Sequence, residues 1–246
     1  MQHDFIRRVE ELYRRSALQH MVTHSGFLTP AEQYSLKSLP HLRESLHLSG
    51  GGADCERQVA FFLPDYLTAE DFNPQDYIRA FQVQCRFNPP SHRDILGSLL
   101  ALGLARWSLG DIYTQGEAAW FFCLPSVSAH IQGSLERVGR GGARVWEIPL
   151  DQVPLPPRLR EPVAFTVSSP RLDALLAGTF GLSREKALGY VEGGLVSLHY
   201  SICLKPATLL HPGDVFSLQG YGKAALREIG GKTRKDRLRV LVEKYR

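Results

Sequence analysis

The chain has 246 residues, 43% of them hydrophobic and 22% charged, a globular composition and a length that predict two or three small domains rather than one large core. Its formal net charge of +4 is unevenly distributed, because residues 1–162 carry 16 Lys and Arg against 18 Asp and Glu, whereas residues 163–246 carry 13 against 7. The longest apolar stretch, residues 95–104, is about half the length that crosses a bilayer, which excludes a membrane-spanning segment.

Residues 1–75 are predicted to form a mostly helical N-terminal region. Apolar side chains from Phe5 to Tyr13 recur at helical spacing, which predicts an amphipathic helix over residues 3–20. This segment has no apolar signal core, so no secretory signal is expected. A second helix is expected to begin after Thr29-Pro30, because threonine caps a helix and proline suits its first turn.

Residues 76–152 are predicted to form a ferredoxin-like domain with the order strand, helix, strand, strand, helix, strand. Ser91 and Asp94 suit the start of its first helix, because their side chains can satisfy the free N–H groups there. The six predicted elements are, in chain order, Arg79–Phe87, His92–Leu104, Asp111–Gln115, Ala118–Leu124, Ser126–Val138 and Arg144–Leu150.

Two motifs in this domain suggest known activities; the first is rejected, and the second is the less favoured alternative. His92-Arg93-Asp94 spells the catalytic triplet of protein kinases, but Leu99 stands where a kinase has its metal-binding Asn. The segment Ala118–Phe122 is aromatic enough for an RNA-recognition sheet but lacks the Lys/Arg-Gly-Phe/Tyr signature. Its aromatic residues alternate onto both faces, which favours a strand covered on both sides.

A smaller arginine cluster lies near the end of this domain. Arg137, Arg140 and Arg144 surround a glycine-rich turn and could make secondary RNA contacts to phosphate, although a solvated turn is the alternative. Residues 153–162 are predicted to form a stiff linker. They contain four prolines, from Pro154 to Pro162, and therefore offer few N–H donors for regular structure.

The C-terminal region, residues 163–246, holds the basic excess, which favours a polyanionic partner; a solvated basic tail is the alternative. A helix is expected from Ser169-Pro170, and Ser183 is expected to cap a second helix that ends at Gly193-Gly194. The predicted strands that follow are Leu195–His199, Val215–Leu218 and Arg237–Lys244.

Several separated positions in this region fall at the spacing of a known RNA-binding motif. They are Arg171-Leu172-Asp173, Ser183-Arg184, Ala187, Val191, Gly194, Val196, Lys205-Pro206 and Gly213-Asp214. Over about residues 168–220 the chain resembles the S-four domain, the αL motif named after the fourth small-subunit ribosomal protein. One departure is His199-Tyr200, where that family usually has Asn-Gly in a tight turn.

Further segments make the whole chain similar to the YlmH family of bacterial S-four proteins. They are Phe61-Phe62-Leu63-Pro64-Asp65-Tyr66, His92-Arg93-Asp94-Ile95-Leu96-Gly97, Gly110-Asp111-Ile112 and Gly220-Tyr221-Gly222-Lys223. The resemblance implies an α+β chain with a helical N-terminal region, a ferredoxin-like middle domain and a C-terminal S-four domain with a basic extension. It also implies RNA binding, association with rRNA and tRNA on the large ribosomal subunit, and a role in quality control of stalled subunits that still carry peptidyl-tRNA.

The candidate RNA-binding side chains follow from this module. Helix starts attract phosphate and guanidinium groups bind it with two hydrogen bonds, so Arg171 and Arg184, at two helix starts, are the leading candidates. Asp173 is expected to orient an arginine or to cap locally rather than to catalyse. The other candidates are Ser183, Lys186, Lys205, Lys223, Arg227, Lys232, Arg234, Lys235, Arg237 and Arg239.

Two other classes of function remain as alternatives. An RNA-modifying enzyme with an S-four targeting domain would need catalytic signatures, and the synthetase and methyltransferase signatures are absent from the sequence. A protein-interaction adaptor would use residues 1–75 to bind a partner. The four cysteines, at 55, 85, 123 and 203, form no C-x-x-C pair, so we expect reduced thiols, no metal site and a cytoplasmic protein. Because catalytic signatures are missing, we expect no catalysis and no cofactor.

Overall fold

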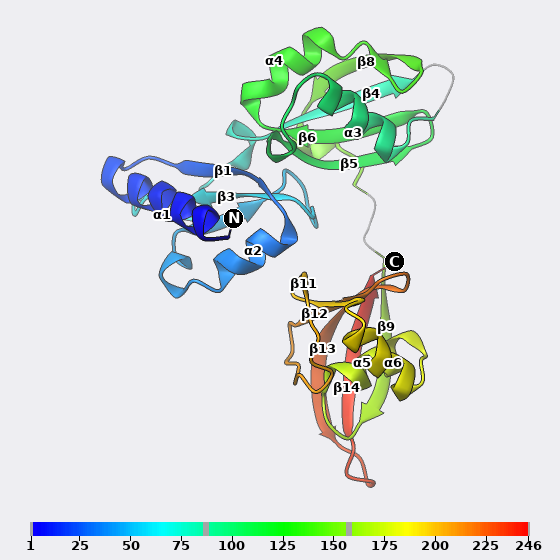
Figure 1. Ribbon diagram of the computed structural model, residues 1–246. Helices are drawn as coiled ribbons and strands as arrows, with labels where there is room; N and C mark the ends of the chain where they lie inside the picture. Colours follow the sequence, from blue (N-terminus) through cyan, green and yellow to red (C-terminus); the bar gives the residue numbers. More distant parts are fainter. Residues whose placement is uncertain (1, 86–88, 156–158, 246) are drawn as a thin grey trace. The chain divides into compact units, whose positions relative to one another are not determined.

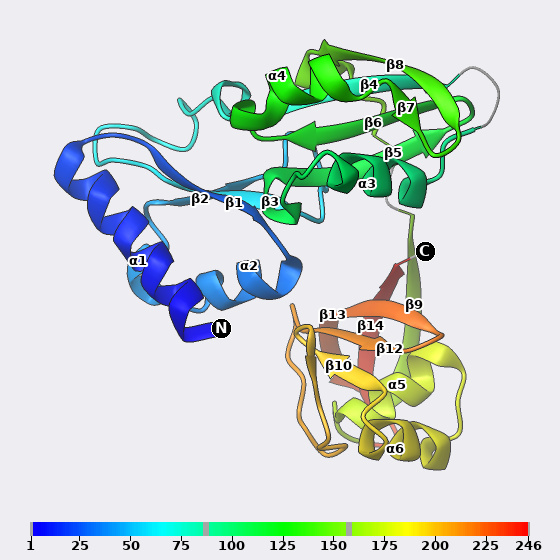
Figure 2. The same ribbon diagram turned by 45° about the horizontal axis from the view of Figure 1, so that its top comes forward.

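A computed structural model describes residues 2–85, 89–155 and 159–245 of the chain (Figures 1 and 2). The chain forms two units, residues 1–156 and residues 157–246. Parts of four predictions lie outside the described residues: the first residue of the N-terminal region, the end of the strand predicted to reach Phe87, residues 156–158 of the linker, and the final residue of the C-terminal region.

The N-terminal unit consists of helices and two main sheets. Its elements, with η for 3-10 helices, are α1 (Gln2–Gln19), β1 (Thr23–Leu28), α2 (Pro30–Lys37), η1 (Pro40–Leu42), β2 (Leu46–Ser49), β3 (Gln58–Phe62), η2 (Pro74–Asp76), β4 (Arg79–Cys85), α3 (His92–Ala101), η3 (Arg106–Ser108), β5 (Leu109–Gln115), β6 (Ala118–Cys123), α4 (Pro125–Ser134), β7 (Arg137–Val138), β8 (Gly141–Ile148) and η4 (Leu150–Gln152).

Capping side chains start two helices where the sequence predicts them. The hydroxyl of Thr29 accepts a hydrogen bond from the backbone N–H of Glu32, whose carboxylate accepts one from the N–H of Thr29 at 2.7 Å. Ser91 and Asp94 form the same reciprocal pair at the start of α3, at 3.2 and 3.1 Å. The hydroxyl and the backbone N–H of Ser91 both donate to the Asp94 carboxylate, and these two hydrogen bonds lower the pKa of Asp94. The His92-Arg93-Asp94 triplet is therefore the first turn of a helix.

The N-terminal region is less helical than predicted, because β1, β3 and β2 form a three-stranded antiparallel sheet in that order. The strands are short, and β1 has an irregular register between His24 and Phe27. Such interruptions remove the two-residue periodicity that would reveal a strand.

Residues 79–148 contain the predicted succession of strand, helix, strand, strand, helix and strand. Their sheet has the order β5-β6-β4-β8-β7, and every neighbouring pair is antiparallel. The predicted end of the second helix is wrong. The helix stops at Ser134, and Arg137-Val138 instead pair with Gly141-Gly142, because Gly139 adopts a left-handed conformation (φ 57°) that turns the chain back.

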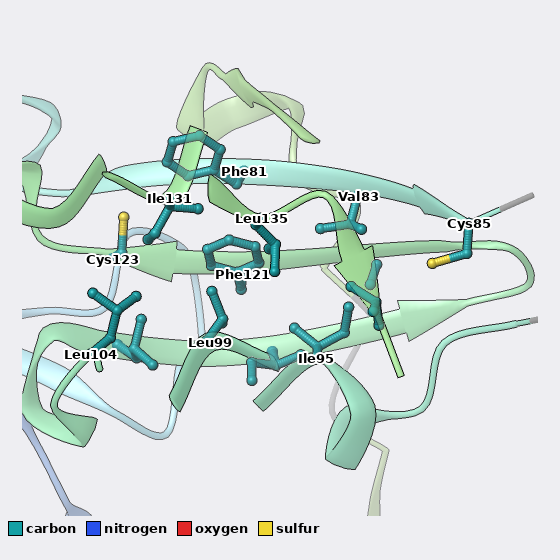
Figure 3. Packing of buried hydrophobic residues seen from close by; sticks show 14 residues of the cluster. Phe81, Val83, Cys85, Ile95, Leu99, Leu104, Phe121, Cys123, Ile131 and Leu135 are labelled. Atoms are coloured by element: carbon teal, nitrogen blue, oxygen red, sulfur yellow. The ribbon is translucent and has the colours of Figure 1, made fainter. Parts of the chain in front are cut away.

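The two sheets of this unit pack face to face between layers of helices. On one side of the β5-β6-β4-β8 sheet, Ile95 and Leu99 of α3 and Ile131 of α4 pack on Phe81 and Phe121 (Figure 3). On the other side, Trp120 and Phe122 pack with side chains of β1 and β3, such as Phe27 and Phe61. The opposite face of the small sheet is covered by α1 and α2. Residues 1–75 and 76–152 thus share one core.

The C-terminal unit is a six-stranded sheet with two helices on one face (Figure 1). Its elements are β9 (Arg160–Val167), α5 (Leu172–Phe180), α6 (Arg184–Glu192), β10 (Val196–Leu198), β11 (Ser201–Ile202), β12 (Val215–Leu218), β13 (Gly222–Lys232) and β14 (Leu238–Tyr245). The sheet order is β11-β10-β12-β13-β14-β9, and all neighbours are antiparallel.

The linker prediction is wrong for residues 160–162, which begin strand β9. Pro162 is tolerated because β9 lies at the edge of the sheet, where a missing N–H breaks no inner ladder. In β14, Val240 and Val242 are buried and Leu238 is partly buried in the core that contains the leucines of α5. Among the described residues, no helix is long and apolar enough to cross a membrane.

Candidate nucleic-acid interface

Two arginines at the start of α5 and α6 converge on one buried carboxylate. Arg171 donates hydrogen bonds from Nε and Nη2 to the two oxygens of Asp173, both at 3.1 Å. Arg184 donates from Nε and Nη2 to Oδ2 of Asp173 at 3.4 Å. The Asp173 side chain is 2% exposed, whereas those of Arg171 and Arg184 are 36% and 53% exposed. We call this group the arginine clamp; it confirms that Asp173 orients arginine.

The clamp holds the two guanidinium groups in place. The sequence predicts free backbone N–H groups beside them at the start of α5, but in the structure these N–H groups already have acceptors. The N–H of Leu172 donates to the carbonyl of Thr208 at 2.8 Å, and that of Asp173 donates to the carbonyl of Pro206 at 3.1 Å. The N–H of Ala174 donates to Oδ1 of Asp173 at 2.8 Å. The start of α5 is therefore used to anchor the loop after β11, and phosphate binding there would depend on the side chains.

Three other candidates lie around the clamp. Ser183 is the N-cap of α6, and its hydroxyl accepts from the backbone N–H of Lys186 at 3.3 Å, which gives Ser183 a structural role. The side chain of Lys186 is exposed on the first turn of α6. Lys205 is also exposed and precedes Pro206, whose carbonyl binds the N–H of Asp173. The structure thus brings Arg171, Arg184, Lys186 and Lys205 to one region.

Lys223 and Arg227 lie elsewhere, on the sheet face that α5 and α6 do not cover. Arg227 donates from Nε to Glu243 at 2.7 Å, and this hydrogen bond is the main reason that the pKa of Glu243 is lowered. Arg160 pairs with the same carboxylate at 3.5 Å. Arg227 therefore joins neighbouring strands, and β14 is held between cations from β13 and β9.

The remaining candidates form a basic hairpin, residues 232–239, between β13 and β14. Lys232 pairs with Asp236 at 2.7 Å, and Arg237 donates to the hydroxyl and carbonyl oxygens of Thr166 at 3.1 and 2.6 Å. These two side chains stabilise the hairpin. Arg234, Lys235 and Arg239 are exposed.

The twelve candidates consequently occupy more than one surface. Lys223 lies against the ring of Tyr245 near the end of β14, whereas Arg239 of the basic hairpin lies near its start. Six residues separate Arg239 from Tyr245, which corresponds to about 20 Å along an extended strand. The basic hairpin is at the end of β9 that leads into Arg171, because Leu238 pairs with Val167. Lys223 and Arg227 are toward the other end of the sheet. Arg160 was missed because the surrounding prolines masked its strand.

In the N-terminal unit, the secondary candidates Arg137, Arg140 and Arg144 are all exposed. Arg137 and Arg140 belong to the β7–β8 turn, where Nη2 of Arg137 donates to the carbonyl of Arg140 at 3.3 Å. Base stacking on β6 is excluded, because Trp120, Phe121 and Phe122 are at most 8% exposed. The covered strand predicted from the sequence is confirmed.

Within the described ranges, no three His, Cys, Asp or Glu side chains are grouped to hold a metal ion. Of the cysteines, Cys55, Cys85 and Cys123 are buried, and Cys203 is half-buried. Burial raises the pKa of Cys123 to about 12. The buried thiols are therefore core residues.

Comparison with known proteins agrees with the resemblance. A family model described as "Putative RNA-binding domain in YlmH" matches residues 68–152. The chain is 31% identical to the Bacillus subtilis (strain 168) protein named "Ribosome-associated protein quality control protein P2", over 245 residues that cover 98% of this chain and 95% of that protein. A solved structure, "Cell division protein ylmH from Streptococcus pneumoniae", has a TM-score of 0.48 and 21% identity, covering 62% of this chain and 89% of that one. By its nearly full-length identity and its domain match, the chain belongs to the YlmH family.

Proposed function

We propose that the chain is a cytoplasmic RNA-binding protein, not an enzyme, and that its C-terminal unit grips structured RNA. The observation that carries this proposal is the arginine clamp, in which Asp173 fixes two exposed guanidinium groups side by side. A guanidinium whose orientation is fixed loses less entropy when it binds phosphate. The matched domain description and the name of the Bacillus subtilis relative support RNA as the ligand.

The finer proposal concerns the domains and the RNA. The C-terminal unit is an S-four domain, and residues 79–148 are a ferredoxin-like domain whose β7–β8 turn makes a secondary contact through Arg137 and Arg140. The RNA is rRNA, with tRNA, on the large ribosomal subunit, and the task is quality control of stalled subunits that hold peptidyl-tRNA. Support for this task comes from the relative's name; support for two contacts comes from exposed arginines on both units.

The test compares RNA affinity between variants with equal changes of charge. The double variant Arg171→Ala/Arg184→Ala should bind a structured rRNA fragment more weakly by about 1–3 kcal/mol for each lost charge-assisted contact. Arg14→Ala/Arg15→Ala, on the exposed face of α1, removes the same charge and should leave the affinity nearly unchanged.

A second variant separates binding from folding, because removal of both arginines leaves the Asp173 carboxylate buried without a cation. Arg171→Lys/Arg184→Lys keeps two cations near Asp173 but loses the planar fork. It should stay folded and still bind RNA more weakly than the wild-type chain. Equal affinity of the wild-type chain and both clamp variants would rule out the clamp as the RNA-binding surface.

A further inference from the structure

The turn between β10 and β11 carries a bulky aromatic residue where the backbone favours glycine. Leu198 pairs with Ser201, so that His199 and Tyr200 form a two-residue hairpin turn. Both residues have left-handed backbone conformations, with φ of 49° and 66°. Turns of this kind favour Asn-Gly, because a side chain on a left-handed residue crowds the neighbouring carbonyl. The chain therefore keeps a tyrosine at a position where glycine would fold more easily.

The surrounding structure holds this strained turn in place. The N–H of His199 donates to the carbonyl of Val215 at 2.8 Å, and Nε2 of His199 lies 3.1 Å from Oδ1 of Asp214. Both contacts fix the turn to the start of β12. Strain that is held by neighbouring contacts is typical of functional positions, so the question is what the Tyr200 side chain does.

Tyr200 lies in a row of alternating cations and aromatic rings. Nζ of Lys223 lies 5.7 Å from the centre of the Tyr200 ring and 4.9 Å from that of Tyr245, and the guanidinium of Arg160 lies 5.6 Å from the Tyr245 ring. Tyr245 and Lys223 belong to neighbouring strands on the sheet face that lacks helices, and Tyr200 is 39% exposed. The strained turn thus places an exposed ring beside a cation that two rings hold in position.

An exposed ring next to a positioned cation suits an unpaired nucleotide. Bases stack on tyrosine whatever their sequence, and a neighbouring lysine binds the phosphate. We propose that Tyr200 and Lys223 form a binding site for an unpaired RNA strand, in which a base stacks on Tyr200 and its phosphate contacts Lys223. The site rests on the proposed function, since it binds single-stranded RNA that flanks the structured RNA held by the arginine clamp.

The test uses the full chain and two RNA probes, a blunt RNA hairpin and the same hairpin with a single-stranded extension of about ten nucleotides. Tyr200→Gly removes the ring and suits the turn, so its melting temperature should equal or exceed that of the wild-type chain. It should bind the extended probe more weakly by about fivefold to 150-fold, or about 1–3 kcal/mol at 1.4 kcal/mol per factor of ten. It should bind the blunt hairpin as the wild-type chain does, and Tyr200→Phe should keep both affinities.

Two further measurements make the result independent of small changes in folding. A 2-aminopurine in the extension should lose fluorescence by stacking when the wild-type chain or Tyr200→Phe binds, and keep it with Tyr200→Gly. Lys223→Gln should make the slope of log affinity against log salt shallower by about 0.7 for the extended probe. If Tyr200→Gly binds both probes as the wild-type chain does, the site is refuted and the proposed function stands. If the wild-type chain binds neither probe, the proposed function itself is wrong.

Discussion

The Asp173 carboxylate lies beneath two exposed guanidinium groups and accepts hydrogen bonds from both. Two opposite effects on RNA binding can therefore be separated at this residue. An acidic group near a phosphate site repels RNA, but a carboxylate that orients arginine helps to bind it. The structure favours the second effect, because the carboxylate itself is 2% exposed.

Replacement of Asp173 by Asn tests which effect dominates. The variant makes the unit more positive by one charge, so a purely electrostatic account predicts tighter RNA binding. We predict weaker binding, by about 1 kcal/mol or more, because the arginines lose their bidentate partner. Fluorescence anisotropy with a structured RNA measures the difference. Asp236→Asn is the matched control: it makes the same charge change in the basic hairpin, at a left-handed residue (φ 56°) that asparagine tolerates, and should not weaken binding.

Residue-level predictions from the sequence were most accurate where chemistry is local. Thr29, Ser91 and Ser183 cap helices as predicted, because a cap depends only on residues a few positions away. The basic charge of the C-terminal region predicts Lys232, Arg227 and Arg237 as RNA ligands, and in the structure each of them is paired to a side chain or carbonyl within its own unit. The partners Glu243 and Thr166 come from other strands, which charge patterning does not reveal.

Among the secondary-structure elements, the strands that the sequence predicts are those in which apolar and polar residues alternate regularly. The predicted range of β12 is the observed one, and β14 is displaced by one residue. β13 was missed because register shifts after Leu226 and Ile229 break its alternation, and β9 was missed because prolines surround its first residues. The sequence does not predict the small sheet β1-β3-β2 for a similar reason, because its strands are short and the register of one is irregular.

The packing between the two sheets of the N-terminal unit depends on a glycine of β5. A Cβ atom at Gly110 would lie 2.7 Å from the ring of Phe27 and 2.8 Å from Cβ of Phe122, closer than such atoms approach. We predict that Gly110→Ala lowers the free energy of unfolding by about 1–3 kcal/mol through overpacking. A Cβ atom at Gly133 of α4 would meet no neighbouring side chain within 4 Å, so Gly133→Ala should raise the free energy of unfolding by about 0.5–1 kcal/mol. Urea unfolding measures both, and a neutral Gly110→Ala would show that the sheets are packed less tightly.

For the whole molecule, the division into two units predicts that the C-terminal unit folds alone, and the arginine clamp in this unit predicts that it also binds RNA alone. A fragment of residues 159–246 keeps all of β9, including Arg160 with its partners Glu243 and Tyr245. A fragment of residues 163–246 lacks the first three residues of β9 and should have a lower melting temperature. Equal melting temperatures would show that the start of β9 contributes nothing.

The longer fragment also tests how RNA is bound. If about six phosphates are contacted, log affinity should fall against log salt with a slope of about −4 to −5. An affinity that does not change with salt would remove the electrostatic basis of the RNA interface. The full chain should bind more tightly than the fragment, because a second, weaker contact in the N-terminal unit acts at high effective concentration.

Sedimentation of the full chain with ribosomes on sucrose gradients, at moderate salt and after translation has been stalled, tests the proposed ribosomal RNA binding most directly. We expect the wild-type chain to sediment with large subunits that carry peptidyl-tRNA. Arg171→Lys/Arg184→Lys should shift toward the top of the gradient, and Arg14→Ala/Arg15→Ala should not. A wild-type chain that stays at the top under stalling would contradict the ribosomal assignment. Co-sedimentation of the Arg171→Lys/Arg184→Lys variant to the same extent as the wild-type chain would contradict the arginine clamp as its RNA interface.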